Sequence, residues 1–341
     1  MAKISTIKDV ALRANVSIAT VSRVINHTGT VKPELESRVQ QAILDLNYSP
    51  NIVARSLKTS NTSTIAFLVS NISDPFFTTI ARGIEDYIKD FGYNLIVCSI
   101  DHSKEKEVAY LQLLKEKKVD GLILNTTGYN DELISEISQY TPIVLSNRRI
   151  NSAFFNGDFV DSDNIGGITA LTKHLISSGH KKIGIINGPS HLSTASERYR
   201  AFHNVMKTTG ITVDASYPYL YEGLFNCESG FNGAKTLMEL EDPPSAIVLM
   251  SSEITLGALQ YFAAHKISVP NDVSIVCFGD IQNRDILYVT PTIASTNLIG
   301  MGIKMGELLL ERIQAKDPVS NREICFTTQI YYGNSVKTAE N

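Results

Sequence analysis

Short apolar runs alternate with amphipathic helical stretches along the chain from residue 63 onward. The first three runs are "TIAFLVS", "NLIVCSI" and "GLILNT", and a stretch with apolar residues at helical spacing follows each of them. Strands and helices that alternate in this way form parallel sheets with helices on both faces. The sequence therefore predicts a doubly wound α/β body, which we place at residues 62–341.

A second series of the same kind predicts that this body has two lobes. Its apolar runs include "KIGIING", "AIVLMS" and "VSIVCFGD". We expect one lobe at about 62–161 and 292–318 and the other at about 162–291 and 319–335, with the late helix "NLIGMGIKMGELLLERIQ" and the last strand "EICFTTQIYYG" passing back through both. Because open α/β sheets bind ligands at the carboxyl ends of their strands, two facing lobes predict a small-molecule site in the cleft between them.

Residues 1–48 predict a separate, all-α headpiece of three short helices. Ser5 or Thr6 is expected to cap the first helix, and Ser17 is expected to cap the second. Asn15 lies between these two helices and tolerates a left-handed backbone, so we expect a tight turn there.

The charge of the chain is distributed unevenly. The formal net charge is −4, but residues 1–60 hold eight Lys or Arg residues against four Asp or Glu residues, which leaves −8 on the rest of the chain. A basic head on an acidic body indicates that the head binds a polyanion, although a chance excess on a solvated surface has the same composition.

The stretch "SIATVSRVIN" at residues 17–26 has the properties of a recognition helix in a helix-turn-helix. Ala11 can lie where the two helices cross, and the residues expected to pack inward are Val16, Val21 and Val24. The residues left facing outward are Ile18, Ala19, Ser22 and Arg23. Exposed apolar side chains suit contact with thymine methyl groups, and arginine pairs with guanine in the major groove. The alternative is a small helical bundle in which Ile18 belongs to the core.

The segment "TIKDVALRANVSIATVSRVIN…YSPNIVARSL" resembles the head of the lac repressor/galactose repressor (LacI/GalR) family of bacterial regulators. The two-lobed body is similar to the sugar-binding, periplasmic-binding-protein-like fold that these regulators carry. The resemblance implies that hydroxyl and amide side chains bind DNA phosphates, namely those of Thr6, Ser17, Thr20 and Asn26. It also implies that Ile18, Ala19 and Arg23 read bases, with Ser22 on the same outward face.

The resemblance further implies a hinge helix within residues 49–61, which otherwise predict a linker that can become helical. Asn51 and Ala54 would line the minor groove, and Leu57 would be wedged between the two central base pairs of the operator. Pyrimidine–purine steps are easily kinked, so a pseudo-palindromic operator with a central CG step is expected. The alternative for Leu57 is a linker leucine that packs on the body.

The resemblance places an effector in the cleft and implies the residues that line it. In the first lobe these are Asn71, Asp74, Phe76, Phe77, Asn147 and Arg148. In the second lobe they are Ser196, Arg200, Ser252 and Asp280.

Two departures from the family pattern bear on the effector. The family often has an Asp directly after the aromatic residue of "GFD", whereas "CFGD" here gives Gly279 and then Asp280. "MSSEITLG" has Ser251 and Ser252 where the family often has Asn-Asp. The loss of these carboxylates argues against a plain neutral hexose bound in the usual way. It leaves room for a sugar acid or sugar phosphate, which Arg148 and Arg200 could pair with.

The predicted function is a DNA-binding transcriptional repressor of carbohydrate-utilisation genes, acting as a cytoplasmic homodimer under the control of a sugar-type effector. A global catabolite-type regulator with a protein corepressor and a sugar-binding protein without a DNA role remain as alternatives. No enzyme, cofactor or metal site is expected, because the glycines of "GMGIKMG" lie within a helical run and the histidines lack ligand spacing. No apolar run approaches ~18 residues, so no membrane insertion is expected.

Overall fold

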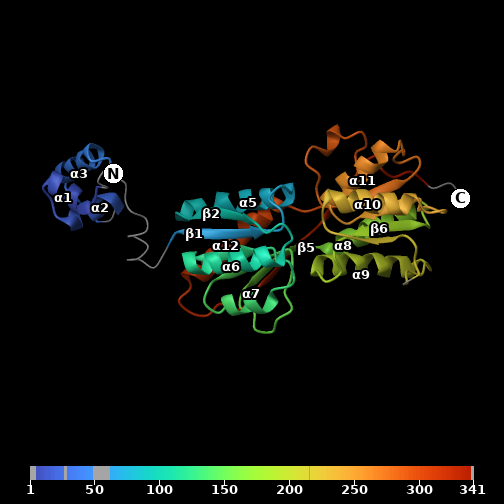
Figure 1. Cartoon of the computed structure of the whole chain (residues 1–341), viewed down its shortest axis with the longest axis horizontal. Coiled ribbons are helices and arrows are strands. Elements are labelled where there is room, and N and C mark those ends of the chain that lie inside the picture. The colour runs from blue at the N-terminus through green and yellow to red at the C-terminus, as the bar shows by residue number, and fades with distance from the viewer. Residues whose placement is uncertain (1–4, 27–28, 49–61, 215, 339–341) are drawn as a thin grey trace. The chain divides into compact units, whose positions relative to one another are not determined.

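The computed structural model describes residues 5–26, 29–48, 62–214 and 216–338. The chain divides into two compact units, Met1–Thr62 and Ser63–Asn341 (Figure 1). The first unit is the predicted headpiece, with helices α1 (Ile7–Ala14), α2 (Ile18–Asn26) and α3 (Pro33–Asp45).

The headpiece turns where the sequence predicted. Thr6 caps α1, and Asn15 has a left-handed backbone with a φ of 51°. The N–H of Asn15 returns to carbonyl oxygens at the end of α1, which satisfies the last turn of that helix. Valine and alanine side chains from all three helices form a small core, which includes Val10, Val21 and Val39.

The second unit contains two lobes, each built on a six-stranded sheet. The first sheet has the order β11-β5-β4-β3-β1-β2 and all its strands are parallel. Its strands are β1 (Thr64–Val69), β2 (Asn94–Ser99), β3 (Gly121–Leu124), β4 (Ile143–Ser146), β5 (Asp158–Ser162) and β11 (Glu323–Phe326). The helices of this lobe are α5 (Pro75–Ile88), η1 (Lys89–Phe91), α6 (Lys104–Lys117), α7 (Asp131–Ile137) and α12 (Leu298–Gln314).

The second sheet has the order β12-β10-β9-β8-β6-β7, and β12 is antiparallel to β10. Its strands are β6 (Ile183–Asn187), β7 (Leu220–Glu222), β8 (Ala246–Leu249), β9 (Ser274–Phe278), β10 (Thr292–Ser295) and β12 (Gln329–Tyr331). The helices of this lobe are α8 (Asn164–Ser177), α9 (Ser193–Thr208), α10 (Cys227–Met238), α11 (Ser252–Ala264) and η2 (Arg284–Ile286).

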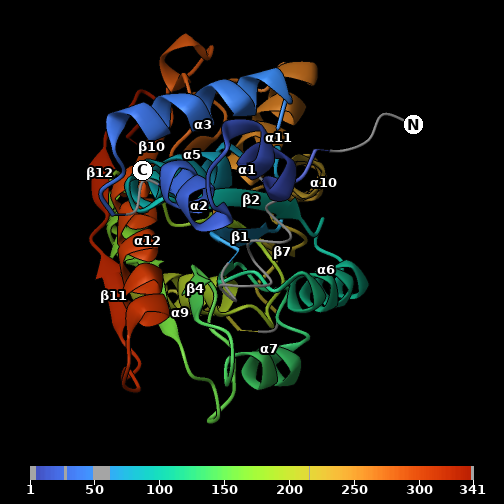
Figure 2. The same cartoon turned by 90° about the vertical axis from the view of Figure 1, so that its left-hand side faces the viewer.

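Helices cover both faces of each sheet, because successive side chains of a strand point to opposite faces. In β1, Ile65 and Phe67 pack against α5 and α12, whereas Ala66 and Leu68 belong to the core beneath α6 and α7. Figure 2 shows α12 and the pair α6 and α7 on opposite sides of this lobe. The second lobe is built likewise, with α8 and α9 on one face and α10 and α11 on the other.

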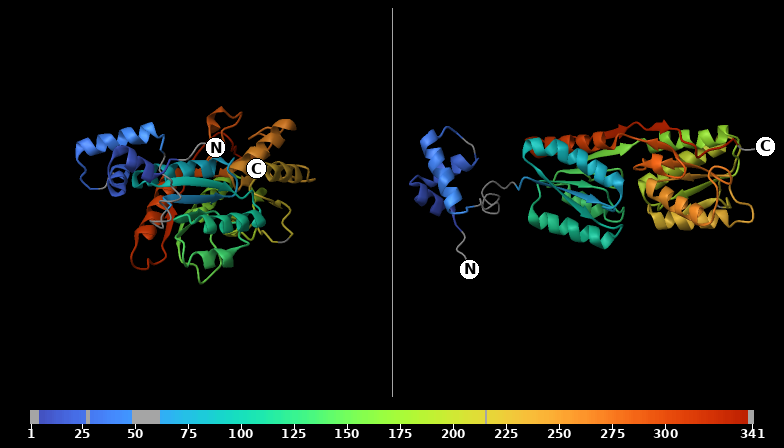
Figure 3. Two further views of the ribbon diagram at one scale, coloured as in Figure 1. Left: turned by 60° about the vertical axis from the view of Figure 1, so that its left-hand side comes forward. Right: turned by 90° about the horizontal axis from the view of Figure 1, so that it is seen from above.

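The chain crosses between the lobes near residues 163, 296 and 327, and these crossings lie side by side (Figure 3). Thr296 Oγ1 donates to the Thr327 carbonyl oxygen at 2.9 Å, and Thr328 Oγ1 donates to that of Asp163 at 3.1 Å.

The crossings correct two expected lobe boundaries. Residues 292–295 form β10 of the second sheet, and residues 323–326 form β11 of the first, the reverse of what the sequence predicted for each. The stretch "EICFTTQIYYG" is therefore two strands in two sheets, divided at the threonine pair Thr327 and Thr328. Both pieces carry the same β-branched pattern, so the pattern alone cannot tell which sheet each one joins.

The glycines of "GMGIKMG" lie within α12 and serve helix packing, as the sequence predicted. A Cβ atom at Gly302 would collide with the backbone of α5 at Ile80, and one at Gly83 would collide with the carbonyl oxygen of Ile299. The second lobe repeats this arrangement between α10 and α11, where Gly230 and Gly257 each face the backbone of the partner helix. Both helix pairs therefore pack backbone against backbone.

Candidate functional site

Helix α2 of the headpiece has one buried and one exposed face. Val21 and Val24 expose 0% and 6% of their surface, whereas Ile18 remains 44% exposed, and Ala19 and Arg23 are exposed as well. An exposed isoleucine beside an exposed arginine suits a helix that contacts base edges in the major groove. Ile18 is therefore not the core residue that the alternative required.

Hydroxyl groups gather at the starts of α1 and α2. Thr6 Oγ1 donates to the Asp9 carboxylate at 2.7 Å in a capping box, and Ser17 Oγ accepts from the N–H of Thr20 at 3.1 Å. Helix N-termini of this kind suit phosphate oxygens. Ser22 is half-buried. Of the other predicted DNA contacts, Asn26 ends α2, and those that lie outside the described residues are Asn51, Ala54 and Leu57.

Arg23 differs from the other arginines of the headpiece. Arg13 pairs with Asp45 at 2.7 Å, and Arg38 donates to the carbonyl oxygens of Ala14 and Asn15. Within residues 5–26 and 29–48, no ion pair or hydrogen bond of this kind holds the Arg23 guanidinium. Arg23 is thus available for a partner outside the protein.

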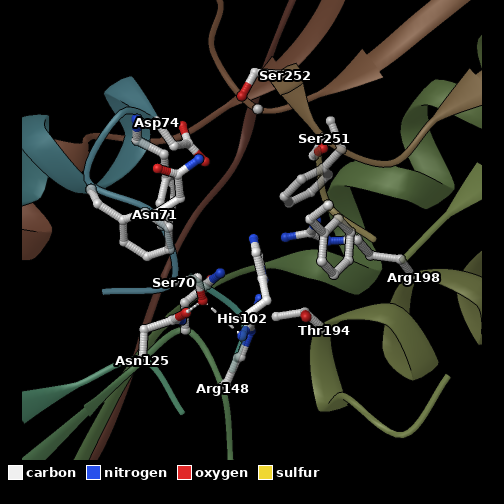
Figure 4. A pocket seen from close by; sticks show the side chains of 16 residues that line it. Ser70, Asn71, Asp74, His102, Asn125, Arg148, Thr194, Arg198, Ser251 and Ser252 are labelled. Carbon is white, nitrogen blue, oxygen red and sulfur yellow. Dashed lines mark hydrogen bonds between the residues drawn. The ribbon is translucent and has the colours of Figure 1, made fainter. Parts of the chain in front are cut away.

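A cavity lies between the lobes, at the carboxyl ends of strands from both sheets (Figure 4). Residues expected from the sequence that line it are Asn71, Asp74, Phe76, Phe77, Asn147, Arg148 and Ser252. Residues that sequence reasoning missed include Ser70, His102, Asn125, Arg198, Phe225 and Phe278.

Arg148 follows β4 and lies fully within the first lobe's side of the cavity, with 4% of its surface exposed. Its Nη1 donates to Ser70 Oγ at 2.9 Å and to the carbonyl oxygen of Thr126 at 2.8 Å. Asn125 accepts from the same Ser70 hydroxyl, so Arg148 is held in a defined position (Figure 4). Burial lowers the pKa of Arg148 to about 10, with a further contribution from the charge of Arg198, and the group remains a cation at neutral pH.

Arg198 comes from α9 and reaches the cavity from the second lobe. Its Nε donates to Asn164 at 2.8 Å and its Nη1 to the carbonyl oxygen of Met250 at 2.6 Å. The guanidinium lies 4.1 Å from the ring centroid of Phe278 and 5.5 Å from that of Phe225. Burial lowers its pKa to about 10 as well. Arg148 lies 6.0 Å from the same Phe225 ring, so two buried cations share one aromatic side chain.

The second-lobe arginine of the cavity is therefore Arg198, and the expectation of Arg200 was wrong. Arg200 and Ser196 are exposed and do not line the cavity. Helical spacing could have distinguished them, because the buried stripe of α9 runs through Ala195, Ala201 and Phe202 and includes position 198 but not position 200.

Asp280 also lies away from the cavity. It is exposed and lines a separate groove near Arg284, while Gly279 takes its place at the cavity wall with a φ of 108°. A glycine, and not the carboxylate of Asp280, therefore lies at this part of the cavity wall. Ser252 does line the cavity, next to Ser251, which caps α11.

Two further titratable groups face the cavity. Burial raises the pKa of Asp74 to about 6, while the N–H of Phe76 and the charge of Arg148 act in the opposite direction. Burial and the nearby Arg148 lower the pKa of His102 to about 4, so this imidazole is neutral at pH 7.

The charge of the cavity is dominated by its arginines. Within the described part of the chain, no carboxylate forms an ion pair with Arg148 or Arg198. The carboxylates that raise their pKa values, such as Glu107 and Asp161, act at longer range. Buried cations without a direct counter-ion favour an anionic ligand.

No group of His, Cys, Asp and Glu residues in the described ranges has the arrangement of a metal site. No helix among the described residues is both long and apolar enough to cross a membrane.

Comparisons with known proteins agree with this architecture. Residues 6–51 match the model described as "Bacterial regulatory proteins, lacI family". Residues 62–334 match the model described as "Periplasmic binding proteins and sugar binding domain of LacI family". Together the two matches cover the headpiece and the body.

Full-length relatives show the same correspondence. The chain is 35% identical over 338 residues to the "HTH-type transcriptional repressor PurR" of Haemophilus influenzae (strain PittEE), covering 98% of this chain and 99% of the relative. It is 36% identical to the "HTH-type transcriptional regulator RegA" of Clostridium saccharobutylicum over 92% of this chain and 94% of that protein.

Solved structures extend the likeness to the fold. The cellobiose complex of the transcriptional regulator CelR superposes with a TM-score of 0.73 at 26% identity, covering 97% of this chain and 99% of CelR. The lac repressor dimer bound to operator has the same fold, with a TM-score of 0.84 at 22% identity, covering 98% of this chain and all of that one. Members of this family are regulators and not enzymes, which confirms the predicted absence of catalysis. The chain therefore belongs to the LacI family and is a DNA-binding transcriptional repressor with an effector-binding domain.

Proposed function

We propose that this repressor controls carbohydrate-utilisation genes and that its effector is an acidic sugar, a sugar acid or a sugar phosphate, bound in the cleft. The observation that carries the proposal is the pair of buried guanidinium groups, Arg148 from one lobe and Arg198 from the other. No carboxylate of the described residues forms an ion pair with either of them. An anion that bridges them supplies charge-assisted hydrogen bonds to both lobes at once. Such a ligand stabilises the closed arrangement of the lobes.

The rest of the cavity suits the remainder of a sugar. Phe76, Phe225 and Phe278 offer aromatic faces to the apolar side of a ring, and Asn71 and Asp74 offer hydroxyl-binding groups. The absence of a carboxylate at Gly279 is consistent with an effector that carries its own negative charge.

The DNA-binding half of the proposal rests on α2. Ile18, Ala19 and Arg23 read bases in the major groove of a pseudo-palindromic operator with a central CG step, and the hydroxyl groups of Thr6, Ser17 and Thr20 bind phosphates. One such helix reads only a few base pairs, so two copies of the chain bind two half-sites as a homodimer. The CelR relative was solved with cellobiose, and a lac repressor structure contains a dimer on its operator, which supports a sugar-type effector and a dimer here.

A ligand screen tests the effector class. The purified dimer is titrated calorimetrically with gluconate, glucuronate, galacturonate, 2-keto-3-deoxygluconate and hexose 6-phosphates, with the neutral hexoses as the comparison. We expect an acid to bind and to change the affinity of the protein for an operator selected from random DNA. Tighter binding of neutral hexoses than of every acid contradicts the proposal. Binding of none of them directs the search to a protein corepressor.

A matched pair of variants on one helix assigns the contact. Arg198→Gln removes a cavity cation, whereas Arg200→Gln removes an exposed cation from the same helix. We expect Arg198→Gln to weaken acid binding by about 30-fold or more, since truncating one partner of a buried charged pair costs about 2–5 kcal/mol. Arg200→Gln should stay within about twofold of the parent protein, because exposed charges contribute little. Equal losses in the two variants contradict the assignment.

A further inference from the structure

A second pocket, which is open to solvent, adjoins the cleft on the side of His102 and Arg148, which line both. We call it the outer pocket. Its walls come from both lobes, with Tyr129 after β3 in the first and Tyr221 of β7 and Asn226 in the second. The outer pocket therefore lies directly beside the cleft, with His102 and Arg148 at the boundary between them.

The lining of the outer pocket is aromatic and hydroxyl-binding. The rings of Tyr129 and His191 lie 4.3 Å apart across the lobe boundary, and His191 Nε2 lies 3.2 Å from the carbonyl oxygen of Thr127. Tyr221 adds a third ring, and the exposed Asn232 adds an amide. Aromatic faces with a few polar groups are the usual lining of sites for sugar-sized ligands.

The charge of the outer pocket is opposite to that of the cleft. Glu222 and Glu228 line it, and Arg148, which already faces the cleft, is the one Lys or Arg among the described residues of its lining. Lys104 lies outside this lining, with its Nζ 5.8 Å from the ring centroid of Tyr129. A second carboxylate or phosphate on a ligand would lie against these glutamates, and like charges brought together at a binding site are repelled. The outer pocket therefore favours a neutral, hydroxyl-bearing group.

His102 lies where the two cavities meet, next to Arg148 (Figure 4). Its Nε2 atom is buried and has no hydrogen-bond partner among the described residues. Its backbone is left-handed, with a φ of 57°, as is that of Asp101, with a φ of 50°. Left-handed conformations of non-glycine residues are uncommon and cluster at binding sites. A neutral imidazole can donate to or accept from an ether or hydroxyl oxygen of a ligand.

We propose that the effector has two sugar units: an acidic unit bound by Arg148 and Arg198 in the cleft, and a neutral unit in the outer pocket, with His102 bonded to the oxygen at their linkage. This inference rests on the acid effector proposed above and specifies its size and the position of its charge. An acidic monosaccharide fills only the cleft and leaves the outer pocket empty.

Calorimetry on the full-length dimer compares each acid with the same acid joined to a neutral sugar. Gluconate is paired with cellobionate and with lactobionate, and glucuronate is paired with glucuronosyl-xylose. Digalacturonate, which carries two carboxylates, is compared with galacturonate. We expect at least one of the mixed disaccharides to bind tenfold or more tightly than its monosaccharide acid, and we expect digalacturonate to gain nothing over galacturonate.

Two variants assign any gain to the outer pocket. Tyr221→Ala should remove the advantage of the mixed disaccharide and leave the monosaccharide acid unchanged, whereas Tyr332→Ala, which removes an exposed tyrosine outside both cavities, should change neither. Glu228→Gln replaces an exposed side chain, so folding is not at risk, and it should improve digalacturonate binding threefold or more.

The outcomes separate this inference from the proposal on which it rests. Binding of monosaccharide acids that equals or exceeds that of every mixed disaccharide overturns the two-unit effector and leaves the acid effector intact. A disaccharide advantage that survives Tyr221→Ala also overturns it. Failure of all acids, single or joined, overturns the acid effector itself.

Discussion

The exposed face of α2 and the cavity of the body are both candidate binding surfaces, but the sequence encodes them in opposite ways. The α2 face comes from one helix of nine residues, and its functional side chains are those that the core does not need. The cavity is assembled from strand ends that lie up to about two hundred residues apart, and its functional side chains are buried. Arg23 is exposed, whereas Arg148 and Arg198 are 4% and 5% exposed. A change in α2 should therefore affect DNA binding alone, while a change in the cavity affects ligand binding and packing together.

The sharpest test of this separation is Arg23→Ala. We expect operator affinity of the dimer to fall by about 10²- to 10⁴-fold, because each half-site loses a base contact worth about 1–3 kcal/mol. The acid effector should bind unchanged, as measured by calorimetry. Arg13→Ala is the control, because it removes the same charge from a residue already paired with Asp45. We expect a smaller loss of operator affinity from Arg13→Ala, and this loss measures the effect of charge alone. Equal losses for Arg13→Ala and Arg23→Ala would contradict a base-reading role for Arg23.

Gly302→Ala tests how much the close packing of α5 and α12 contributes to the stability of the body. We expect the free energy of unfolding of the body to fall by about 1–3 kcal/mol, since the added methyl group collides with the backbone of α5. Gly306→Ala is the matched control in the same helix, because its nearest neighbours are the side chains of Ile88 and Tyr87. Denaturant unfolding of the full chain measures both. A Gly302→Ala variant as stable as the parent shows that the helices separate at little cost.

Thr6→Ala tests the stability of the headpiece, and its effect should be smaller than that of Gly302→Ala on the stability of the body. Loss of the capping box should lower headpiece stability by about 1 kcal/mol, the typical value for replacing an N-cap threonine by alanine. Thr6→Ser keeps the hydroxyl and should preserve both stability and operator binding. The headpiece transition in calorimetry gives the stability, and a change in the transition of the body instead would contradict the independence of the two units.

The smallest expected effect is a pH dependence confined to the cavity. At pH 8 Asp74 is ionised and repels an acidic ligand, and it binds a proton as the pH falls through its pKa of about 6. Affinity for a carboxylate effector should therefore rise about three- to tenfold between pH 8 and pH 5.5. A tenfold rise corresponds to about 1.4 kcal/mol of binding free energy. A phosphate monoester also binds a proton near pH 6 and then carries less negative charge for the arginines to bind. Its gain in affinity as the pH falls should therefore be smaller. Operator binding by a protein without effector serves as the reference.

Asp74→Asn should flatten this pH profile. Any pH dependence of effector affinity that remains near pH 7 is expected from Asp161, which lies near Arg198. Burial and the nearby Glu197 raise the pKa of Asp161 to about 7. If the parent protein binds a carboxylate effector more weakly as the pH is lowered, the predicted repulsion by ionised Asp74 is wrong.

The two regions also differ in what the sequence could predict. Local signals placed the headpiece turn at Asn15, the first cap at Ser5 or Thr6 and the second at Ser17, because each depends on neighbours within a few residues. The alternation of strands and helices likewise predicted two sheets and a cleft at their carboxyl ends. These features follow from short-range periodicity, which the chain displays directly.

The parts that the sequence did not predict depend on pairing between distant segments. Whether β10 and β11 join the first or the second sheet is decided by long-range hydrogen bonds, and both have the same local pattern. The choice of Arg200 over Arg198 was a different error, since the apolar stripe of α9 carried the correct signal. His102 and Phe225 come from loops, where no periodicity marks a residue as part of a site.

The helix pair α5 and α12 links two parts of the body. Helix α5 begins next to Asp74 in the cavity, and α12 begins at Asn297, where the chain has just crossed from the other lobe. Their glycine contact packs the two helices backbone against backbone, and α5 is about 20 Å long at about 1.5 Å per residue. The far end of α5, at Ile88, is tied through Tyr93 and Asn94 to Ser63, the first residue of the body. Helix α5 therefore connects the wall of the cavity with the point where the chain enters the body from its DNA-binding part.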